Sequence, residues 1–423
     1  MSAESLDSTE ATPVDEKALD PKAEFHTKWW GFEVHLNQPA IDLVQGFRDV
    51  IEEIVSPFLP TPLSEIVSAA CLLQREWIKA VSKGHGCKLV SPWFSPTMLI
   101  PVPLNAPTSD TNLWWTVFEP DKGWSTDEVF PAHGSAGHPA LAVFKDKLYC
   151  VHRGYGGNDA DLWWTVHTPD RGWSPDNKFP AHGSASGPAL AVFQDKLYCA
   201  HRGNTDANLW ITSFNGTSWS ADRQIPSTGS STGPALAVFD GKLYMVFKGN
   251  SDTNIWWTST SNGTNWTSPQ AIPNHGTGAN PALAVFNGKL YCVTRGTTDA
   301  DLWWTTFNGS TWTTPRKFPA HGSREGVGLA VFKGKLYCVH RGNTDQSLWW
   351  TAFDGNNWSA DTRLPAHTSG ASPAMAVYRD QNGTRDQLMC VHRGFGERFV
   401  SQDGEVLTAE APGDHSQDPA PQR

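Results

Sequence analysis

The sequence predicts a β-propeller with six blades of four antiparallel strands, preceded by a small α+β module with a helical hairpin. The first reason is a repeated phrase of the type Leu-Trp-Trp-Thr, a tight turn and a further Trp, which begins at Leu113, Leu162, Leu209, Ile255, Leu302 and Leu348. The steps between these positions are 49, 47, 46, 47 and 46 residues. The second reason is that 17 of the 21 tryptophans fall in three phases of this repeat. A constant period of this length with strand-type content is typical of a propeller.

Four segments are predicted along the 423 residues. Residues 1–24 and 409–423 are polar, lack periodicity and are expected to be disordered. Residues 25–105 form the small module, in which strands at 30–36 and 87–93 pair and two amphipathic helices lie between them. The second helix is a candidate for docking to a membrane or a partner, but its charged residues favour an ordinary amphipathic core helix. Residues 106–408 form the propeller.

Each repeat contains four strand candidates. In the unit that begins at Pro281, strand a (281–286) turns at Asn287-Gly288 into strand b (289–295), and a loop leads to strand c (302–307). A second Asn-Gly turn leads to strand d (311–318). These strands are apolar on both faces, so each blade needs neighbours on both sides.

The repeat is offset at its two ends. The first intact half is the c–d half that begins at Leu113, and the last is the a–b half that begins at Pro373. This offset predicts that the two halves complete one blade and so remove the open sheet edges. A seventh, degenerate blade that uses residues 98–103 and 398–402 is the alternative.

Composition limits the function classes. The formal net charge of −10 argues against a nucleic-acid partner, because phosphate contacts need a basic surface. The first residues contain no apolar segment of a signal peptide, and no run of 18 apolar residues predicts a membrane span. Five cysteines and Met245 share one repeat position, which indicates buried free thiols in a reducing compartment. A cytoplasmic location is expected, with non-classical release as the route outward.

Polar residues recur at the propeller end that carries the b–c loops and the d–a connections. The d–a connections carry a histidine in five repeats, with Ser227 interrupting the series. Strand b closes with Arg, the b–c loop contains Asp, and strand c starts with Trp. The predicted ligand contacts are Arg153, Asp159, Trp163, Arg202, Asp206, Trp210, Arg295, Asp299, Trp303, Arg341, Asp345, Trp349, Arg393, His182 and His321.

This pattern favours repeated, shallow sugar sites. An aromatic ring supports the apolar face of a pyranose, while Arg donates to its hydroxyls and Asp accepts from them. Several weak sites on one chain gain by avidity. The same Arg and Asp residues equally fit bridges between neighbouring blades. No spacing of metal-ligand type occurs, so neither a metal nor a cofactor is expected.

The residues from about 110 to 394 resemble the six-bladed fucose-specific β-propeller lectins of fungi and bacteria, and more loosely the tectonins. The resemblance implies a multivalent lectin that binds glycans ending in fucose or another monosaccharide, through Arg and an aromatic residue. The third group in that family is Glu, whereas the recurring acid here is Asp. The c–d turns also resemble the Asp-box of sialidases without its ordered Ser and Asp.

The alternative function is a single site on the ring axis. It would belong to a sialidase-like enzyme or a protein-interaction propeller. A third possibility is a toxin-like protein in which residues 25–105 act and the propeller directs them to their target. Six near-copies of one pattern favour repeated binding over one reaction. Departures from the repeat, such as Phe247-Lys248 and Arg324-Glu325, would be the specialised residues of a single site.

Overall fold

A computed structural model describes residues 23–28, 31–36, 87–92, 100–103, 108–155, 159–380, 382–395, 397–400 and 406–407. The chain divides into two compact units, which are described separately. One comprises residues up to 109 together with 397–410, and the other contains residues 110–396. The predicted helical hairpin and both predicted disordered tails lie outside the described residues, apart from residues 23 and 24 at the start of the first strand.

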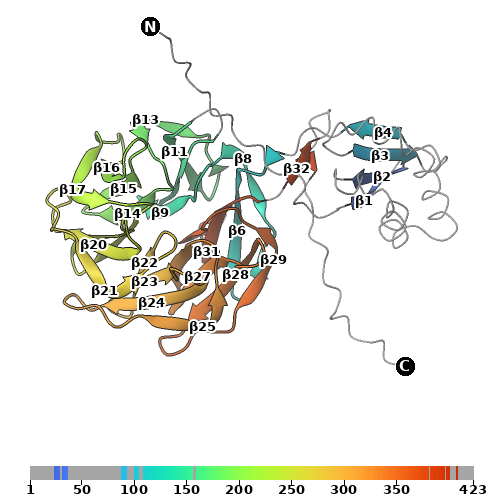
Figure 1. Ribbon diagram of the computed structural model, residues 1–423. Helices are drawn as coiled ribbons and strands as arrows, with labels where there is room; N and C mark the ends of the chain where they lie inside the picture. The colour runs from blue at the N-terminus through green and yellow to red at the C-terminus, as the bar shows by residue number, and fades with distance from the viewer. Residues whose placement is uncertain are drawn as a thin grey trace, which may run out of the picture. The chain divides into compact units, whose positions relative to one another are not determined.

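The larger unit is a six-bladed propeller of four-stranded antiparallel blades, as predicted (Figure 1). Strand a of blades 1 to 6 is β9 (Ala140–Phe144), β14 (Ala189–Phe193), β18 (Ala235–Phe239), β22 (Ala282–Phe286), β26 (Val327–Phe332) and β30 (Ala374–Arg379). Strand b is β10 (Lys147–Arg153), β15 (Lys196–Arg202), β19 (Lys242–Lys248), β23 (Lys289–Arg295), β27 (Lys335–Arg341) and β31 (Asp386–Arg393).

The outer strands follow in the same blade order. Strand c is β11 (Asp161–Thr168), β16 (Asn208–Phe214), β20 (Asn254–Thr260), β24 (Asp301–Phe307), β28 (Ser347–Phe353) and β6 (Asn112–Glu119). Strand d is β13 (Asn177–Gly183), β17 (Arg223–Gly229), β21 (Gln270–Gly276), β25 (Arg316–Gly322), β29 (Thr362–Thr368) and β8 (Glu128–Gly134). Short strands β12 (Gly172–Trp173) and β7 (Gly123–Trp124) extend blades 1 and 6.

The ring closes inside blade 6. Strand β31 pairs with β6 in antiparallel register from Leu388↔Phe118 to Arg393↔Leu113. The six a strands contact one another in sequence, including β30 with β9, so they form a closed inner ring. Closure by the first c–d half and the last a–b half is therefore confirmed, and it leaves blade 6 with the same four strands as the others.

The alternative of a seventh blade is wrong, because both of its proposed strands pair elsewhere. In the smaller unit, β1 (Ala23–Lys28), β2 (Gly31–Leu36), β3 (Cys87–Pro92) and β4 (Ile100–Pro103) form one antiparallel sheet in that order. Thus residues 100–103 pair with β3, and the predicted pairing of β2 with β3 is confirmed. Strand β32 (Glu397–Val400) pairs with β5 (Thr108–Ser109) and β33 (Val406–Leu407).

Tight turns set the hairpins between strands a and b. Asn287 and Gly288 both have positive φ, 47° and 69°. Two consecutive left-handed residues form a type I′ turn, whose twist matches that of the flanking strands. The sequence signal Asn-Gly therefore fixes the a–b register at this position, Phe286↔Lys289.

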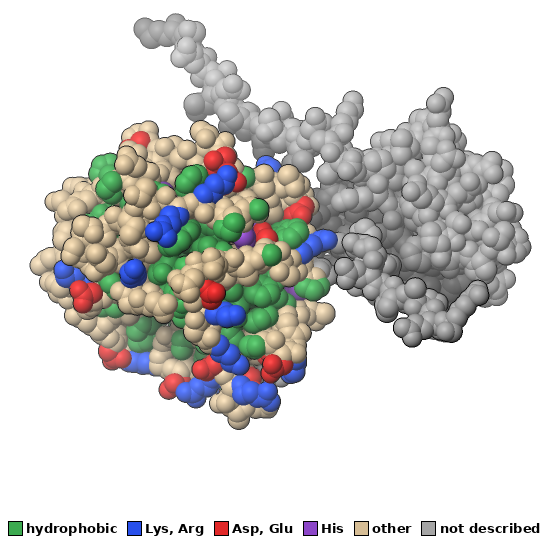
Figure 2. All heavy atoms as spheres, turned by 90° about the horizontal axis from the view of Figure 1, so that it is seen from below, with side chains coloured by type: hydrophobic (Ala, Val, Ile, Leu, Met, Phe, Trp, Pro, Cys, Tyr) green, Lys and Arg blue, Asp and Glu red, His purple; other side chains and the backbone are tan. Residues whose placement is uncertain are grey.

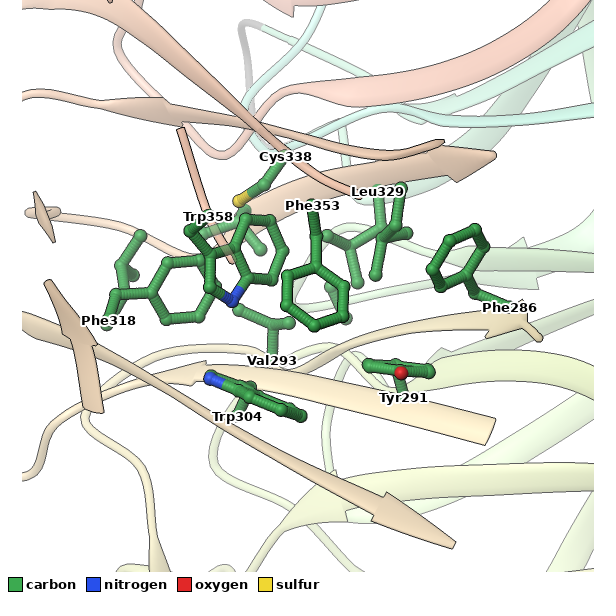
Figure 3. Close-up of a cluster of buried hydrophobic side chains, with 13 residues drawn as sticks. Phe286, Tyr291, Val293, Trp304, Phe318, Leu329, Cys338, Phe353 and Trp358 are labelled. Atoms are coloured by element: carbon green, nitrogen blue, oxygen red, sulfur yellow. The ribbon is translucent and has the colours of Figure 1, made fainter. Parts of the chain in front are cut away.

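Aromatic side chains fill the boundaries between blades. In Figure 3, Trp304 and Tyr291 of blade 4 stack with centroids 5.7 Å apart, and Phe353 of blade 5 packs on Trp304 at 5.4 Å. The ring centroid of Trp358 in blade 5 lies 4.1 Å from that of Phe318 in blade 4. The second Trp of each phrase and the Trp after the turn are therefore packing residues, as expected. The five cysteines in the propeller are buried and free, also as expected.

One buried ring in this packing is a histidine. His167 is 2% exposed and lies 5.0 Å from Trp173 and 5.6 Å from Trp115. Four other blades carry Phe at this repeat position. Burial lowers the pKa of His167 from 6.5 to about 4, so the ring is neutral in the folded protein at neutral pH.

We expect His167→Phe to stabilise the protein and to flatten its pH dependence. Between pH 6.5 and 4 the unfolded chain binds a proton that the folded His167 does not. Its contribution to stability is therefore complete above pH 6.5, and up to about 3 kcal/mol is lost as the pH falls towards 4. Urea denaturation at pH 7 and pH 5 measures the difference. An unchanged pH dependence in the variant would show that His167 is protonated in the folded state.

Within the part of the chain that the structure describes, there is no helix with the length and apolarity of a membrane span.

Candidate functional site

The b–c loops and d–a connections share one end of the propeller, where the first Trp of each phrase is half-buried in all six blades. In five blades its indole N–H donates to the Asp four residues earlier. The donor–acceptor distances are 2.9 Å for Trp114 and Trp163, and 3.3–3.5 Å for Trp210, Trp256 and Trp349. Five of the six Trp rings, those of Trp163, Trp210, Trp256, Trp303 and Trp349, make no ring-to-ring contact within the described residues.

The same Asp closes the b–c loop. Asp159 Oδ1 accepts from the backbone N–H of Asp161 at 3.0 Å, and the equivalent bond recurs in every blade. This is an Asx turn, which lets a short side chain replace a backbone acceptor. The preceding Gly is required, because a Cβ at Gly154 would lie 2.2 Å from the Asp159 carboxylate. The Asp therefore holds the loop and orients the Trp.

The Arg at the end of strand b lies on the other face of its blade. His152 is paired with Trp163, whereas Arg153 is paired with Leu162, and directly paired residues share a face. Arg202 Nε donates to the Ser230 carbonyl at 2.7 Å, in the connection to the next blade. The structure thus separates the Arg from the Trp of its own blade.

The combination that forms instead crosses a blade boundary. Each Arg faces the following blade, and each first Trp faces the preceding one. Arg153 of blade 1 and Trp210 of blade 2 therefore face the same boundary, and the other pairs follow the same rule. The side chains that face the same boundary are Arg153 and Trp210, Arg202 and Trp256, Arg295 and Trp349, Arg341 and Trp114, and Arg393 and Trp163.

The histidines belong to buried units between blades. Asp222 lies 2.9 Å from His201 of its own blade and 3.6 Å from His182 of blade 1. Asp176, Asp361 and Asp127 bridge two histidines in the same way. His182 and His321 are 2% exposed. Ligand contact by these two residues stays a prediction, and their burial disfavours it.

Sequence reasoning missed the aspartate of this unit, although the repeat contains a signal for it. Blades 3 and 4 have Phe247 and Thr294 in place of the strand-b histidine, and both have proline, Pro269 and Pro315, in place of the aspartate. The d–a residue that faces Phe247 comes from blade 2 and is Thr228. The one that faces Thr294 comes from blade 3 and is His275, whose Nε2 lies 2.9 Å from the Thr294 hydroxyl. The interruption in the d–a series is therefore at Thr228, and the assignment to Ser227 was wrong by one residue.

Side chains also meet across the ring axis at this end. The residue that precedes strand a is His138, Gly187, Gly233, Asn280, Gly326 or Ser372. Ser372 donates to Asn280 at 2.9 Å from a blade two positions away. A Cβ at Gly187 would lie 2.4 Å from the His138 ring, so that ring occupies the space the glycine leaves. Burial lowers the pKa of His138 to about 4.

One boundary departs from the repeat. Glu325, in the connection between blades 4 and 5, lies 3.6 Å from Arg341 Nη1. The Arg341 guanidinium also lies 4.8 Å from the centroid of Phe395, which follows strand b of blade 6. Phe395 and its counterpart Tyr155 in blade 1 are 41% and 51% exposed, whereas the other four blades have Asn or Thr there. Sequence reasoning noted Glu325 but missed both aromatic residues.

The described residues contain no cluster of His, Cys, Asp and Glu that fits a metal ion. On the face seen in Figure 2, basic, acidic and apolar side chains are interspersed over the blades and form no broad field of one sign.

No protein-family model matches the chain, and no curated protein matches its sequence significantly. Solved structures with a similar fold include the Aleuria aurantia lectin in complex with Fucα1-6GlcNAc, at 12% identity and a TM-score of 0.46, over 64% of this chain and 89% of the lectin. An α-L-arabinofuranosidase from Clostridium thermocellum matches at 14% identity and a TM-score of 0.40, over 53% and 93%. A glycoside hydrolase from Xanthomonas citri in complex with xylotriose matches at 14% and 0.36, over 55% and 92%.

Proposed function

We propose that the propeller is a multivalent carbohydrate-binding protein without catalysis, with its sites at the blade boundaries of the b–c loop end. The observation that carries the proposal is the repeated, half-buried Trp whose indole N–H is held by an Asp in five blades. A ring fixed in this way loses little conformational entropy when a sugar stacks on it. The Arg of the preceding blade supplies hydrogen-bond donors at the same boundary.

Repetition supports binding over a reaction. A retaining glycosidase needs two carboxyl groups about 5–5.5 Å apart in one site, with distinct roles. Here the recurring carboxylates bond their own loop and Trp, and Glu325 is surrounded by arginines. Shallow sites of equal design gain instead by acting together on a branched or clustered glycan. We also propose a reducing, cytoplasmic setting, which the five buried free thiols support.

The test is a glycan array with the full chain, followed by calorimetry with the best glycan. We expect several equivalents per chain, and we expect Trp163→Ala to remove one of them without unfolding the protein. Lys122→Ala is the control, because Lys122 is 70% exposed in a c–d turn at the opposite end. A folded protein that binds no glycan would contradict the proposal, and so would a stoichiometry that Trp163→Ala leaves unchanged. A single equivalent per chain would favour one specialised site, and release of sugar from a bound glycoside would favour an enzyme.

A further inference from the structure

The b–c loop end of blades 4 to 6 carries more positive charge than the repeat requires. The Glu325 carboxylate interacts electrostatically with four arginines. They come from blades 4, 5 and 6 and from the connection between blades 4 and 5, and are Arg341, Arg324, Arg295 and Arg393. Arg324 and Glu325 occupy positions that hold Ala, Ser, Thr or Gly in every other connection. Nearby Asp345 and Asp110 already bond their own Trp and loop backbone. Arg324 thus adds a fourth guanidinium to the three that the repeat supplies, and Glu325 is the carboxylate that this connection adds.

Arg341 is the centre of this cluster. Its side chain is 8% exposed, and among the described residues it forms one ion pair, the 3.6 Å contact with Glu325. Arg341 Nε is buried and has no hydrogen-bond partner among the described residues. A guanidinium has five N–H donors, and a buried charged donor that lacks a hydrogen-bond partner is unfavourable. The equivalent Arg202 and Arg295 each bond a backbone carbonyl through Nε, whereas the Nε atoms of Arg341 and Arg153 have no hydrogen-bond partner among the described residues.

Phe395 supplies an apolar wall beside these donors. Its ring lies 4.8 Å from the Arg341 guanidinium and is 41% exposed. A Cβ at Gly370 would lie 3.3 Å from the Phe395 ring and from Arg393 Nη1, so the glycine leaves room for both groups. An exposed aromatic face next to buried guanidinium donors suits a ligand with one apolar face and one anionic edge.

We propose that the boundary between blades 5 and 6 binds a pyranose that carries a carboxylate, with the ring on Phe395 and the carboxylate on Arg341. Guanidinium and carboxylate match in a two-point geometry, which a neutral hydroxyl does not offer. The inference rests on the proposed function, since it names the sugar class of one site among the repeated ones. Glu325 keeps the arginines in place when the site is empty and opposes the incoming carboxylate.

The experiment uses calorimetry on the full chain with methyl glycosides of glucuronic, galacturonic and N-acetylneuraminic acids, each compared with its methyl ester. The ester keeps the ring and removes the charge. We expect at least one acid to bind at one equivalent per chain, about tenfold or more tightly than its ester. Arg341→Gln should abolish that preference. Arg171→Gln, which removes one positive charge from an exposed turn at the other end, should leave it intact.

Glu325→Gln separates this proposal from a purely structural role of the cluster. If Glu325 repels the carboxylate of the ligand, the Glu325→Gln variant should bind the acid about threefold or more tightly than the unmodified protein does. Equal affinity for every acid and its ester, or a preference that survives Arg341→Gln, would overturn the inference. Neutral glycans that still bind through Trp163 would then leave the proposed function standing. Binding of acids alone, unaffected by Trp163→Ala, would retain the inference and overturn the repeated neutral sites.

Discussion

Trp304→Ala is expected to reduce the free energy of unfolding by about 3–5 kcal/mol, whereas Trp303→Ala should cost about 1 kcal/mol or less. The two residues are adjacent in β24 but lie on opposite faces. Trp304 is 9% exposed and packs against Tyr291 and Phe353 at a blade boundary, so its removal leaves a cavity. Trp303 is half-buried and makes no ring-to-ring contact within the described residues.

Urea denaturation followed by circular dichroism measures this difference without relying on tryptophan fluorescence. The Trp303 variant is the control for loss of one indole from the same strand. Equal losses of stability in both variants would show that the first Trp is a packing residue like the second. That result would also remove the structural basis of the proposed sugar sites.

Asp222→Ala is expected to destabilise the protein by about 2–4 kcal/mol, because it leaves the buried imidazole of His201 without its acceptor and removes the carboxylate beside His182, whose Nε2 also lies 3.2 Å from the Ser220 carbonyl. His201 Nε2 lies 2.9 Å from the Asp222 carboxylate, and His182 Nε2 lies 3.6 Å from it. The His201 ring is 1% exposed, so water does not replace its lost partner.

The repeat itself offers the rescue. The boundary between blades 2 and 3 is built from Thr228, Phe247 and Pro269 at the same three positions. We expect the triple variant His182→Thr, His201→Phe and Asp222→Pro to recover at least half of the stability lost in Asp222→Ala. Thermal unfolding of the two variants side by side tests this. A triple variant less stable than Asp222→Ala would show that the three positions are not an exchangeable unit.

The periodic part of the structure was predictable because each blade repeats the same local signals. The tight turns, the recurring Trp phrase and the offset between Leu113 and Pro373 together specify six blades and their closure. The site was harder to predict, because strand pairing decides which side chains share a face. Arg153 and Trp163 look like one cluster in the sequence, yet the pairing of Trp163 with His152 places them on different boundaries.

Other site residues stand out only when the repeats are compared position by position. Phe395 and Tyr155 follow the same glycine that precedes Asn or Thr in four blades, so their aromatic character is visible in the sequence once the phase is known. The meeting of Arg341 with Glu325 is different. It depends on how a d–a connection passes the end of a neighbouring strand b, and no local pattern states that distance.

The closure of blade 6 also decides when the protein can finish folding during synthesis. Strand β6 leaves the ribosome early, but its partner β31 ends at Arg393. At about 5–20 residues per second, roughly 15–55 s separate the two strands, and one edge of β6 stays unpaired throughout. Nascent chains that stop within blade 6 would therefore expose strand edges at both ends of an incomplete ring, which makes them prone to aggregate.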